Sequence, residues 1–300
     1  MEFKLAVDSR VMLAETPIWD PRLKKLYWTD LFEGTVHRYN PATGQDEKAE
    51  THSLIGSAIP CSTVGKLLVA VDDGMMLLDF ETGQMELVAA PQPNTGEFRY
   101  NDTRCDAAGR IFTSSVSKAY AESNFNPDTM AGKFYMINPD GTVVTLVDKI
   151  VQYNTIFFDK ANKNLYVVDT YYKKLLRFDY SVEAGASGKP QVVIEFEDMP
   201  DGVAVDADDN IYVCHWSDKR HITVWSLKDY SLVKTIPFPV KHICCPGFGG
   251  DDMRDLYVAT SKFWLPEGDP DFAAGAGGIF LTRNAVAGLP EHFYHDTPHA

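Results

Sequence analysis

The sequence predicts an all-β fold, a six-bladed β-propeller that forms a single domain over residues 1–300. Three observations lead to this prediction. A hairpin pattern recurs six times at intervals of about 45 residues, which is the length of a propeller blade. Turn-forming segments rich in Asn, Asp, Gly and Pro separate further short apolar strands between the copies. No stretch keeps an apolar period of about 3.6 residues, so no long helix is expected.

Each copy of the hairpin has an apolar or small residue, a polar turn, and a Leu or Ile that opens an apolar strand. The residues that open this strand are Leu26, Leu67, Ile111, Leu165, Ile211 and Leu256. The fifth copy, Val205–Val213, shows the pattern most clearly, because its turn contains Asp206, Asp208 and Asp209. We interpret these three acids as solvated turn residues without a functional role.

Further strands are expected between the copies, each followed by a turn or loop rich in Gly, Asn, Pro or Ser. These strands are Thr35–Tyr39, Met75–Phe80, Lys133–Ile137 and Leu175–Phe178. Together with the hairpins they give about four strands per repeat, as in a propeller blade.

Two segments depart from the repeat. Ser117–Thr129 is polar and lengthens the third interval, so we expect a loop over one face, in the position of a lid. Gly277–Pro290 reads as a last strand and turn that closes the ring by completing the N-terminal blade. An open β-sandwich is the alternative architecture, and the number and even spacing of the copies favour the propeller.

Composition and charge narrow the classes of partner. The formal net charge of −14 leaves no basic face for phosphates, so no nucleic-acid partner is expected. The five cysteines show no C-x-x-C spacing and are expected to be reduced and mostly buried. No secretory signal and no membrane-spanning segment is recognised, so we expect a cytoplasmic protein that does not bind membranes. Whether it is a monomer or a homo-oligomer stays open.

Polar residues stand just before several hairpins, where the loops entering the innermost strands of a propeller would meet on one face. Glu15, Asn154 and Asp201 are three such residues, and Asp201 lies between Pro200 and Gly202 in what we interpret as a turn. Two carboxylates and one amide form an oxygen-donor set that suits a divalent cation with open positions. The alternative is that each residue only caps a turn.

The sequence resembles the SMP-30/gluconolactonase/luciferin-regenerating-enzyme family, which includes regucalcin and bacterial sugar lactonases. The resemblance covers nearly the whole chain and is most specific in the motifs AETPIWDPRLKKLYWTD, RYNDTRCDAAGRIF, NTIFFDKANKNLYVVD, MPDGVAVDADDNIYVC and FGGDDMRDLYVAT. It implies a six-bladed propeller with one divalent metal at the mouth of the tunnel. The matching metal ligands are Glu15, Asn154 and Asp201, and the matching substrate contacts are Arg99 and Asn101.

Three motifs depart from the family pattern. Ala14-Glu15-Thr16-Pro17 replaces Gly-Glu-Gly-Pro, and Asn101-Asp102-Thr103-Arg104 replaces Asn-Asp-Gly-Lys. Lys118 stands where an acidic residue is frequent. Because the three metal ligands are intact, these departures bear on substrate preference more than on metal binding.

The resemblance implies hydrolysis of a sugar-acid lactone by metal-activated attack of water. Asp201 is the candidate catalytic residue that accepts the proton of the water, and Arg99 and Asn101 hold the substrate. The cation could be Ca²⁺, Zn²⁺, Mg²⁺, Mn²⁺ or Fe²⁺, all of which accept this donor set. Two alternatives stay open, a metal-dependent phosphotriesterase and a non-catalytic propeller that binds a divalent metal.

Overall fold

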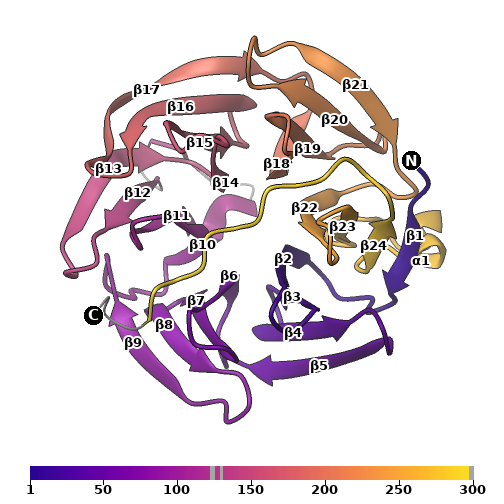
Figure 1. Cartoon of the computed structure of the whole chain (residues 1–300), viewed down its shortest axis with the longest axis horizontal. Coiled ribbons are helices and arrows are strands. Elements are labelled where there is room, and N and C mark those ends of the chain that lie inside the picture. The colour runs from indigo at the N-terminus through magenta and orange to yellow at the C-terminus, as the bar shows by residue number, and fades with distance from the viewer. Residues whose placement is uncertain (122–125, 129–130, 297–300) are drawn as a thin grey trace.

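Six four-stranded antiparallel sheets surround a central axis in the computed structural model of the chain, which describes residues 1–121, 126–128 and 131–296 (Figure 1). In each sheet the strands follow one another from the axis to the rim, and the first strand of one blade contacts the first strand of the next. This arrangement confirms the predicted six-bladed β-propeller.

The innermost strands line the axis. They are β2 (Ala14–Asp20), β6 (Ile55–Pro60), β10 (Phe98–Cys105), β14 (Tyr153–Phe158), β18 (Met199–Val205) and β22 (Ile243–Gly249). The second strands are β3 (Lys25–Asp30), β7 (Lys66–Val71), β11 (Ile111–Ser117), β15 (Asn164–Asp169), β19 (Asn210–Trp216) and β23 (Asp255–Thr260). The third strands are β4 (Thr35–Asn40), β8 (Gly74–Asp79), β12 (Gly132–Ile137), β16 (Lys174–Ser181), β20 (His221–Ser226) and β24 (Ile279–Thr282). The outermost strands are β5 (Gln45–Glu50), β9 (Met85–Ala89), β13 (Val143–Ile150), β17 (Gly185–Glu195), β21 (Leu232–Pro237) and β1 (Lys4–Val7).

The recurring Leu or Ile of the sequence repeat opens the second strand of every blade and packs between neighbouring blades. All six of these side chains are at most 2% exposed. Burying one such side chain contributes about 1.5–3 kcal/mol, so the repeat specifies the apolar layers between blades. Aromatic contacts add to these layers: Trp19 of the first blade stacks on Tyr257 of the sixth, with ring centroids 6.2 Å apart. All five cysteines are free and buried, as predicted.

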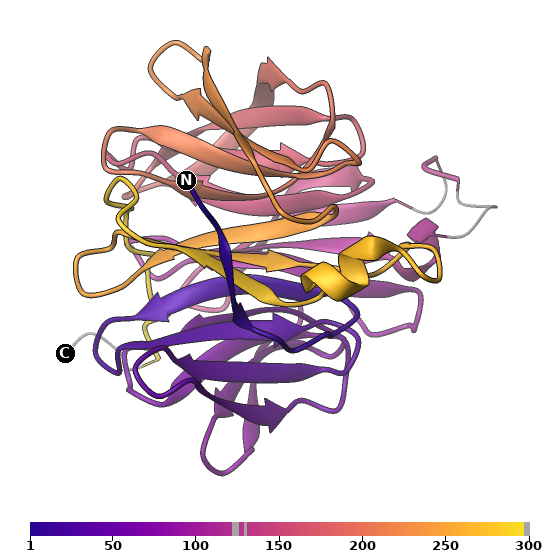
Figure 2. The same ribbon diagram turned by 90° about the vertical axis from the view of Figure 1, so that its right-hand side faces the viewer.

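The ring closes differently from the prediction. The C-terminal strand β24 stays in its own blade, where it pairs with β23, and the N-terminal strand β1 pairs with its free edge. Lys4 lies opposite Leu281 in this pairing. The expectation that the C-terminal strand completes the N-terminal blade was therefore wrong, because the first blade already has four strands of its own, β2 to β5. Figures 1 and 2 show the N-terminal segment at the outer edge of the sixth blade.

Helices are short among the described residues. The α-helix α1 (Pro270–Ala274) lies between β23 and β24, and a 3₁₀-helix covers Lys118–Ala121. None of the described helices combines the length and the apolar character needed to cross a bilayer. The predicted lid, Ser117–Thr129, begins as the end of β11 and this 3₁₀-helix, whereas residues 122–125 and 129 of it lie outside the described residues.

The segment after β24 crosses one face of the ring, from the sixth blade toward the second (Figure 1). We call residues 285–296 the C-terminal strap. Its Leu289 donates a backbone hydrogen bond to Val205 O, and its Tyr294 donates one to Pro60 O. Glu291 of the strap lies 3.6 Å from Nε of Arg104, which belongs to the innermost strand of the third blade. The strap therefore contacts the inner strands of three blades at the same end of the ring.

Candidate functional site

All six innermost strands are irregular at the same level. The pairing of β18 with β19, for example, is regular up to Pro200 and resumes at Val203. Between these two points, Asp201 and Gly202 oppose the single residue Cys214 of β19, which is a β-bulge. Equivalent register shifts occur in the other five blades. The first residues inside these shifts are Gly56, Asn101, Asn154, Asp201 and Cys244, and in β2 the residue just before the shift is Glu15.

The predicted metal ligands therefore lie inside strands. Glu15, Asn154 and Asp201 belong to β2, β14 and β18, and the segment Pro200–Gly202 is a bulged strand. The interpretation of that segment as a turn was wrong, because a Pro without an N–H is tolerated at a bulge and does not have to end a strand. Gly202 is required there by close packing, since a Cβ atom would lie 2.4 Å from Sγ of Cys245 in the next blade.

Four of the predicted site residues form one chain of side-chain hydrogen bonds across three blades. Arg99 donates from Nη1 to Oδ1 of Asn101 (2.7 Å), and Asn101 donates from Nδ2 to Oδ1 of Asn154 (2.5 Å). Asn154 in turn donates from Nδ2 to Oδ1 of Asp201 (2.6 Å) and to Oγ1 of Thr170 (2.7 Å). The two asparagines and Asp201 are buried. The bulges thus aim side chains from different blades at one point on the axis.

Two carboxylates face each other at this point. One oxygen of Glu15, one of Asp201 and Sγ of Cys244 all lie within 4.8 Å of one another. Burial raises the pKa of Asp201 well above its usual range, and the charges of Glu15 and Asp102 add to this effect. Burial also raises the pKa of Glu15 to about 7, with a further contribution from Asp102. A cation between the two carboxylates would offset both costs, so these residues fit a metal ion.

Asn154 turns its nitrogen, and not its oxygen, toward Asp201. A half-turn of this amide would exchange the two atoms and bring Oδ1 beside the carboxylate. Among the described His, Cys, Asp and Glu side chains, Cys244 places a third ligand atom, its thiol sulfur, close to Glu15 and Asp201. Cys244 was not among the residues predicted from the sequence. Aligning the copies brings it close to the predicted ligands, because Asp201, Glu15 and Cys244 stand 10, 11 and 12 residues before the Ile or Leu that opens the second strand.

A pocket of about 270 Å³ opens above this level, and all five predicted site residues line it. Its wall has two unlike halves. The third and fourth blades provide a polar half that includes Arg99, Lys118 and Gln152. The first, second, fifth and sixth blades provide an apolar half, whose members are Leu13, Leu31, Phe32, Leu54, Met199, Trp216, Phe263 and Trp264. The apolar half was not predicted from the sequence, because its members come from segments far apart in the chain.

Two of the residues that depart from the family pattern, Lys118 and Thr103, have different environments. Lys118 lines the pocket, and its Nζ lies 2.7 Å from Oδ2 of Asp72, so its charge is already paired. Thr103 is buried below the pocket, where its hydroxyl lies 2.8 Å from that of Thr113. Only Lys118 is therefore placed to contact a ligand.

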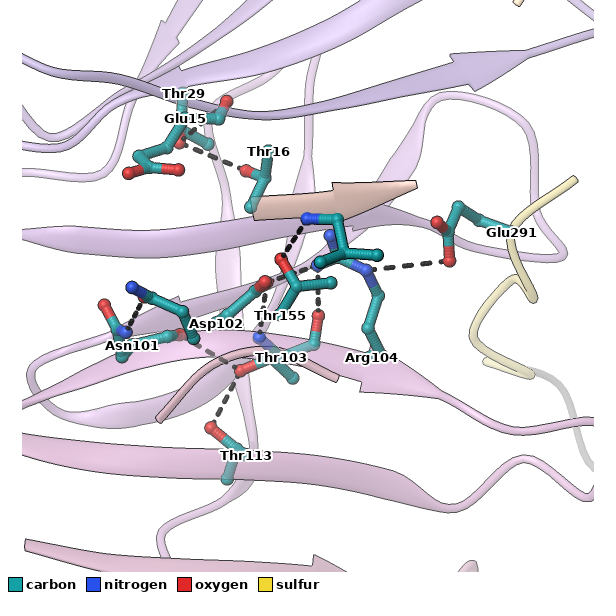
Figure 3. Close-up of polar contacts among 12 residues, drawn as sticks. Glu15, Thr16, Thr29, Asn101, Asp102, Thr103, Arg104, Thr113, Thr155 and Glu291 are labelled. Carbon is teal, nitrogen blue, oxygen red and sulfur yellow. Dashed lines mark hydrogen bonds and ion pairs between the residues drawn. The ribbon is translucent and has the colours of Figure 1, made fainter. Parts of the chain in front are cut away.

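A second polar layer lies beneath the first, toward the strap (Figure 3). Asp102 forms a buried ion pair with Arg104, and Glu291 of the strap lies on the other side of that guanidinium. Because Arg104 compensates the charge of Asp102, this layer serves as a support for the site above it.

His215 in β19 is a packing residue. It is buried, its ring stacks on His221 with centroids 4.9 Å apart, and its Nε2 lies 2.6 Å from Oγ1 of Thr223. Burial lowers its pKa to about 4.

The family model described as SMP-30/Gluconolactonase/LRE-like region matches residues 13–262. The chain belongs to this family. It is 29% identical over 293 residues to the pentonolactonase XacC of Haloferax volcanii, covering 95% of both chains. It is 26% identical to the 6-deoxy-6-sulfogluconolactonase of Pseudomonas putida, covering 97% of this chain and 98% of the relative.

Among solved structures, a calcium-binding regucalcin from Agrobacterium tumefaciens superimposes with a TM-score of 0.88 at 24% identity. The match covers 98% of this chain and 97% of the other. This likeness supports the propeller fold along the whole chain.

Proposed function

We propose that this protein is a metal-dependent hydrolase that opens a sugar-acid lactone by attack of water on the lactone carbonyl. The observation that carries the proposal is the pair of facing carboxylates, Glu15 and Asp201, at the floor of a small pocket. The names of its lactonase relatives support the same reaction class. The closed ring supplies a rigid frame for the three predicted metal ligands, because each of them lies on an innermost strand.

Glu15 and Asp201 would hold the cation, joined by Asn154 once its amide has turned. A bound divalent cation supplies Lewis-acid polarisation of a carbonyl oxygen. Carboxylate and amide oxygens accept Ca²⁺, Mg²⁺, Mn²⁺, Zn²⁺ and Fe²⁺. These three ligands alone therefore do not decide which metal binds, and the identity of the metal has to be measured.

Asp201 is the proposed proton acceptor for the attacking water. In the metal-free site its Oδ1 accepts a hydrogen bond from Asn154. Once the Asn154 amide has turned, the shared cation would take over the task of orienting this carboxylate. In the metal-free site burial and the charge of Glu15 raise the pKa of Asp201. A bound cation would lower this pKa, so the carboxylate would be ionised and able to accept the proton. No covalent intermediate is needed for this route, since water is the nucleophile.

Arg99 and Asn101 have different proposed roles. Arg99 lines the pocket with a fixed guanidinium that can donate to the hydroxyls or ring oxygen of a lactone. The amide of Asn101 already contacts Arg99, Asn154 and the carbonyl oxygen of Tyr153. A direct contact of Asn101 with substrate would replace one of these bonds, so its first role is to position its two neighbours.

The decisive experiment measures hydrolysis of five- and six-carbon aldonolactones by the metal-stripped protein, with single metals added back. We expect no activity without metal and recovery with at least one cation. Activity that survives complete removal of metal would refute metal dependence. Inactivity on every aldonolactone with all five cations, together with hydrolysis of aryl phosphotriesters, would identify the phosphotriesterase alternative. Inactivity on both panels despite metal binding would favour a non-catalytic metal-binding propeller.

A further inference from the structure

The residue that the sixth blade contributes at the level of the carboxylates is a cysteine. Cys244 occupies in β22 the place that Asp201 occupies in β18, the first residue of the bulge, and Glu15 directly precedes the bulge of β2. Its side chain is completely buried, and its Sγ lies within 4.8 Å of a carboxylate oxygen of each acid. The only hydrogen bond found for this thiol in the described part of the chain is a weak one to His242 O, at 3.6 Å.

Sulfur changes which cations a site prefers. Ca²⁺ and Mg²⁺ are hard cations that take oxygen ligands almost exclusively, whereas Zn²⁺ binds thiolate, imidazole and carboxylate ligands. Two carboxylate oxygens and one thiolate match the three-ligand plan of catalytic zinc sites. If the amide oxygen of Asn154 also binds, zinc can expand to five-coordinate and still admit a water or substrate. Among the described residues, no other group of this composition gathers three potential ligand atoms so closely.

We propose that Cys244 is a thiolate ligand of the cation held by Glu15 and Asp201, and that it directs the site toward thiophilic divalent cations such as Zn²⁺. The inference rests on the metal site of the proposed function and adds a ligand that the family resemblance did not supply. On binding, the S–H bond breaks as the sulfur–metal bond forms, and the proton passes to solvent.

Other cysteines nearby provide a matched control. Cys214 is also completely buried, and it lies on β19 opposite the bulge that carries Asp201. It is not part of the group formed by Glu15, Asp201 and Cys244. Cys214→Ser therefore makes the same chemical change in a similar environment without removing the proposed ligand.

The test uses Co²⁺ as a spectroscopic probe, added to the metal-stripped full-length protein in one equivalent. A thiolate bound to Co²⁺ gives an intense sulfur-to-metal charge-transfer band in the near ultraviolet. We expect this band in the wild type and in Cys214→Ser, and its loss in Cys244→Ser. Competition titrations should show that Cys244→Ser lowers the preference for Zn²⁺ over Ca²⁺ by at least about tenfold.

Two outcomes would overturn the inference. One is a wild-type protein that binds one Co²⁺ without the band, a result that needs no variant to fold. The other is a band that persists in Cys244→Ser. Neither outcome depends on lactone hydrolysis, so the proposed function could stand while this inference fails. Conversely, a protein that shows the band but does not hydrolyse lactones would support the sulfur ligand and contradict the proposed reaction.

Discussion

Asn154 donates a hydrogen bond from Nδ2 to Oδ1 of Asp201 at 2.6 Å, although the two residues belong to different blades. The bond closes a chain that starts at Arg99 in the third blade and ends in the fifth. Because each member sits on a bulge or beside one, a shift of one blade would move the carboxylate relative to the guanidinium. The orientation of Asp201 is therefore a property of the packed ring.

Replacing Asp201 should impair lactone hydrolysis without destabilising the fold. We expect Asp201→Asn to lower lactone hydrolysis by about 100-fold or more, because the general base is lost. The metal-free variant should unfold at the same or a higher temperature, since the repulsion from Glu15 disappears. Steady-state kinetics and thermal unfolding measure the two effects. Asp208→Asn, in an exposed turn, is the control and should change neither the rate of hydrolysis nor the unfolding temperature. Hydrolysis at the wild-type rate by Asp201→Asn would show that Asp201 is not the general base.

Metal affinity should depend on pH through the two facing carboxylates. The pKa of Glu15 is about 7 and that of Asp201 is also raised, so protons compete with the cation as the pH falls below 7. Once a ligand is protonated, each further pH unit should weaken binding by about tenfold. Calorimetric titrations of the metal-stripped protein at several pH values between 5 and 8 measure this slope. A flat profile would mean that the carboxylates do not hold the metal.

The apolar half of the pocket should select among lactones. Trp264 is 53% exposed and lines the pocket together with Phe263, on which it stacks with centroids 4.9 Å apart. For Trp264→Ala we expect kcat/KM to fall by about tenfold more for lactones with an alkyl or aryl substituent than for unsubstituted aldonolactones, since apolar contact area is lost.

Tyr172→Ala is the matched control for this specificity test. Tyr172 is 54% exposed but does not belong to the pocket lining. Its replacement should leave the ratio between the two kinds of lactone unchanged. An equal loss on both kinds in Trp264→Ala would assign the tryptophan a general structural role.

His215 should make stability sensitive to acid. Its pKa is about 4 in the folded protein and about 6.5 when unfolded, so the unfolded chain binds the proton first as the pH falls. The folded state therefore loses up to about 3 kcal/mol between pH 6.5 and pH 4, and none of this loss occurs above pH 7. Urea unfolding should show that His215→Gln removes this part of the pH dependence, whereas His52→Gln, at an exposed position, should retain it. Identical pH profiles of wild type and His215→Gln would contradict the assignment.

Much of the site could be predicted because the propeller repeats itself. Glu15, Asn154 and Asp201 were found by asking what precedes each hairpin, and the ring brings those positions to one level on its axis. Arg99 and Asn101 joined them through the family resemblance, and both line the same pocket. Equivalent positions in the innermost strands of a propeller lie close together around its axis, whatever the conformation of the loops.

The unpredicted features depend on contacts between distant segments. A local pattern such as Pro200–Gly202 is compatible with a turn or a bulged strand, and only pairing with β19 decides between them. Nothing in the first seven residues indicates that β1 joins the last blade, because that choice depends on which sheet has a free edge. Cys244 was overlooked for another reason: cysteine was considered for disulfides and redox chemistry, and not as a member of the ring of donors.

The C-terminal strap bears on how substrate and product reach and leave the site. It lies across the face opposite the pocket, where Glu291 and Arg104 belong to the layer beneath the carboxylates (Figures 1 and 3). Among the described residues, the ion pairs of Arg104 with Asp102 and Glu291 therefore lie between the carboxylates and the strap. The open-chain acid that a lactonase forms carries a negative charge that the lactone lacks, and the guanidinium of Arg99 in the pocket wall would attract it. We therefore expect the acid product to compete with the next lactone for the same pocket.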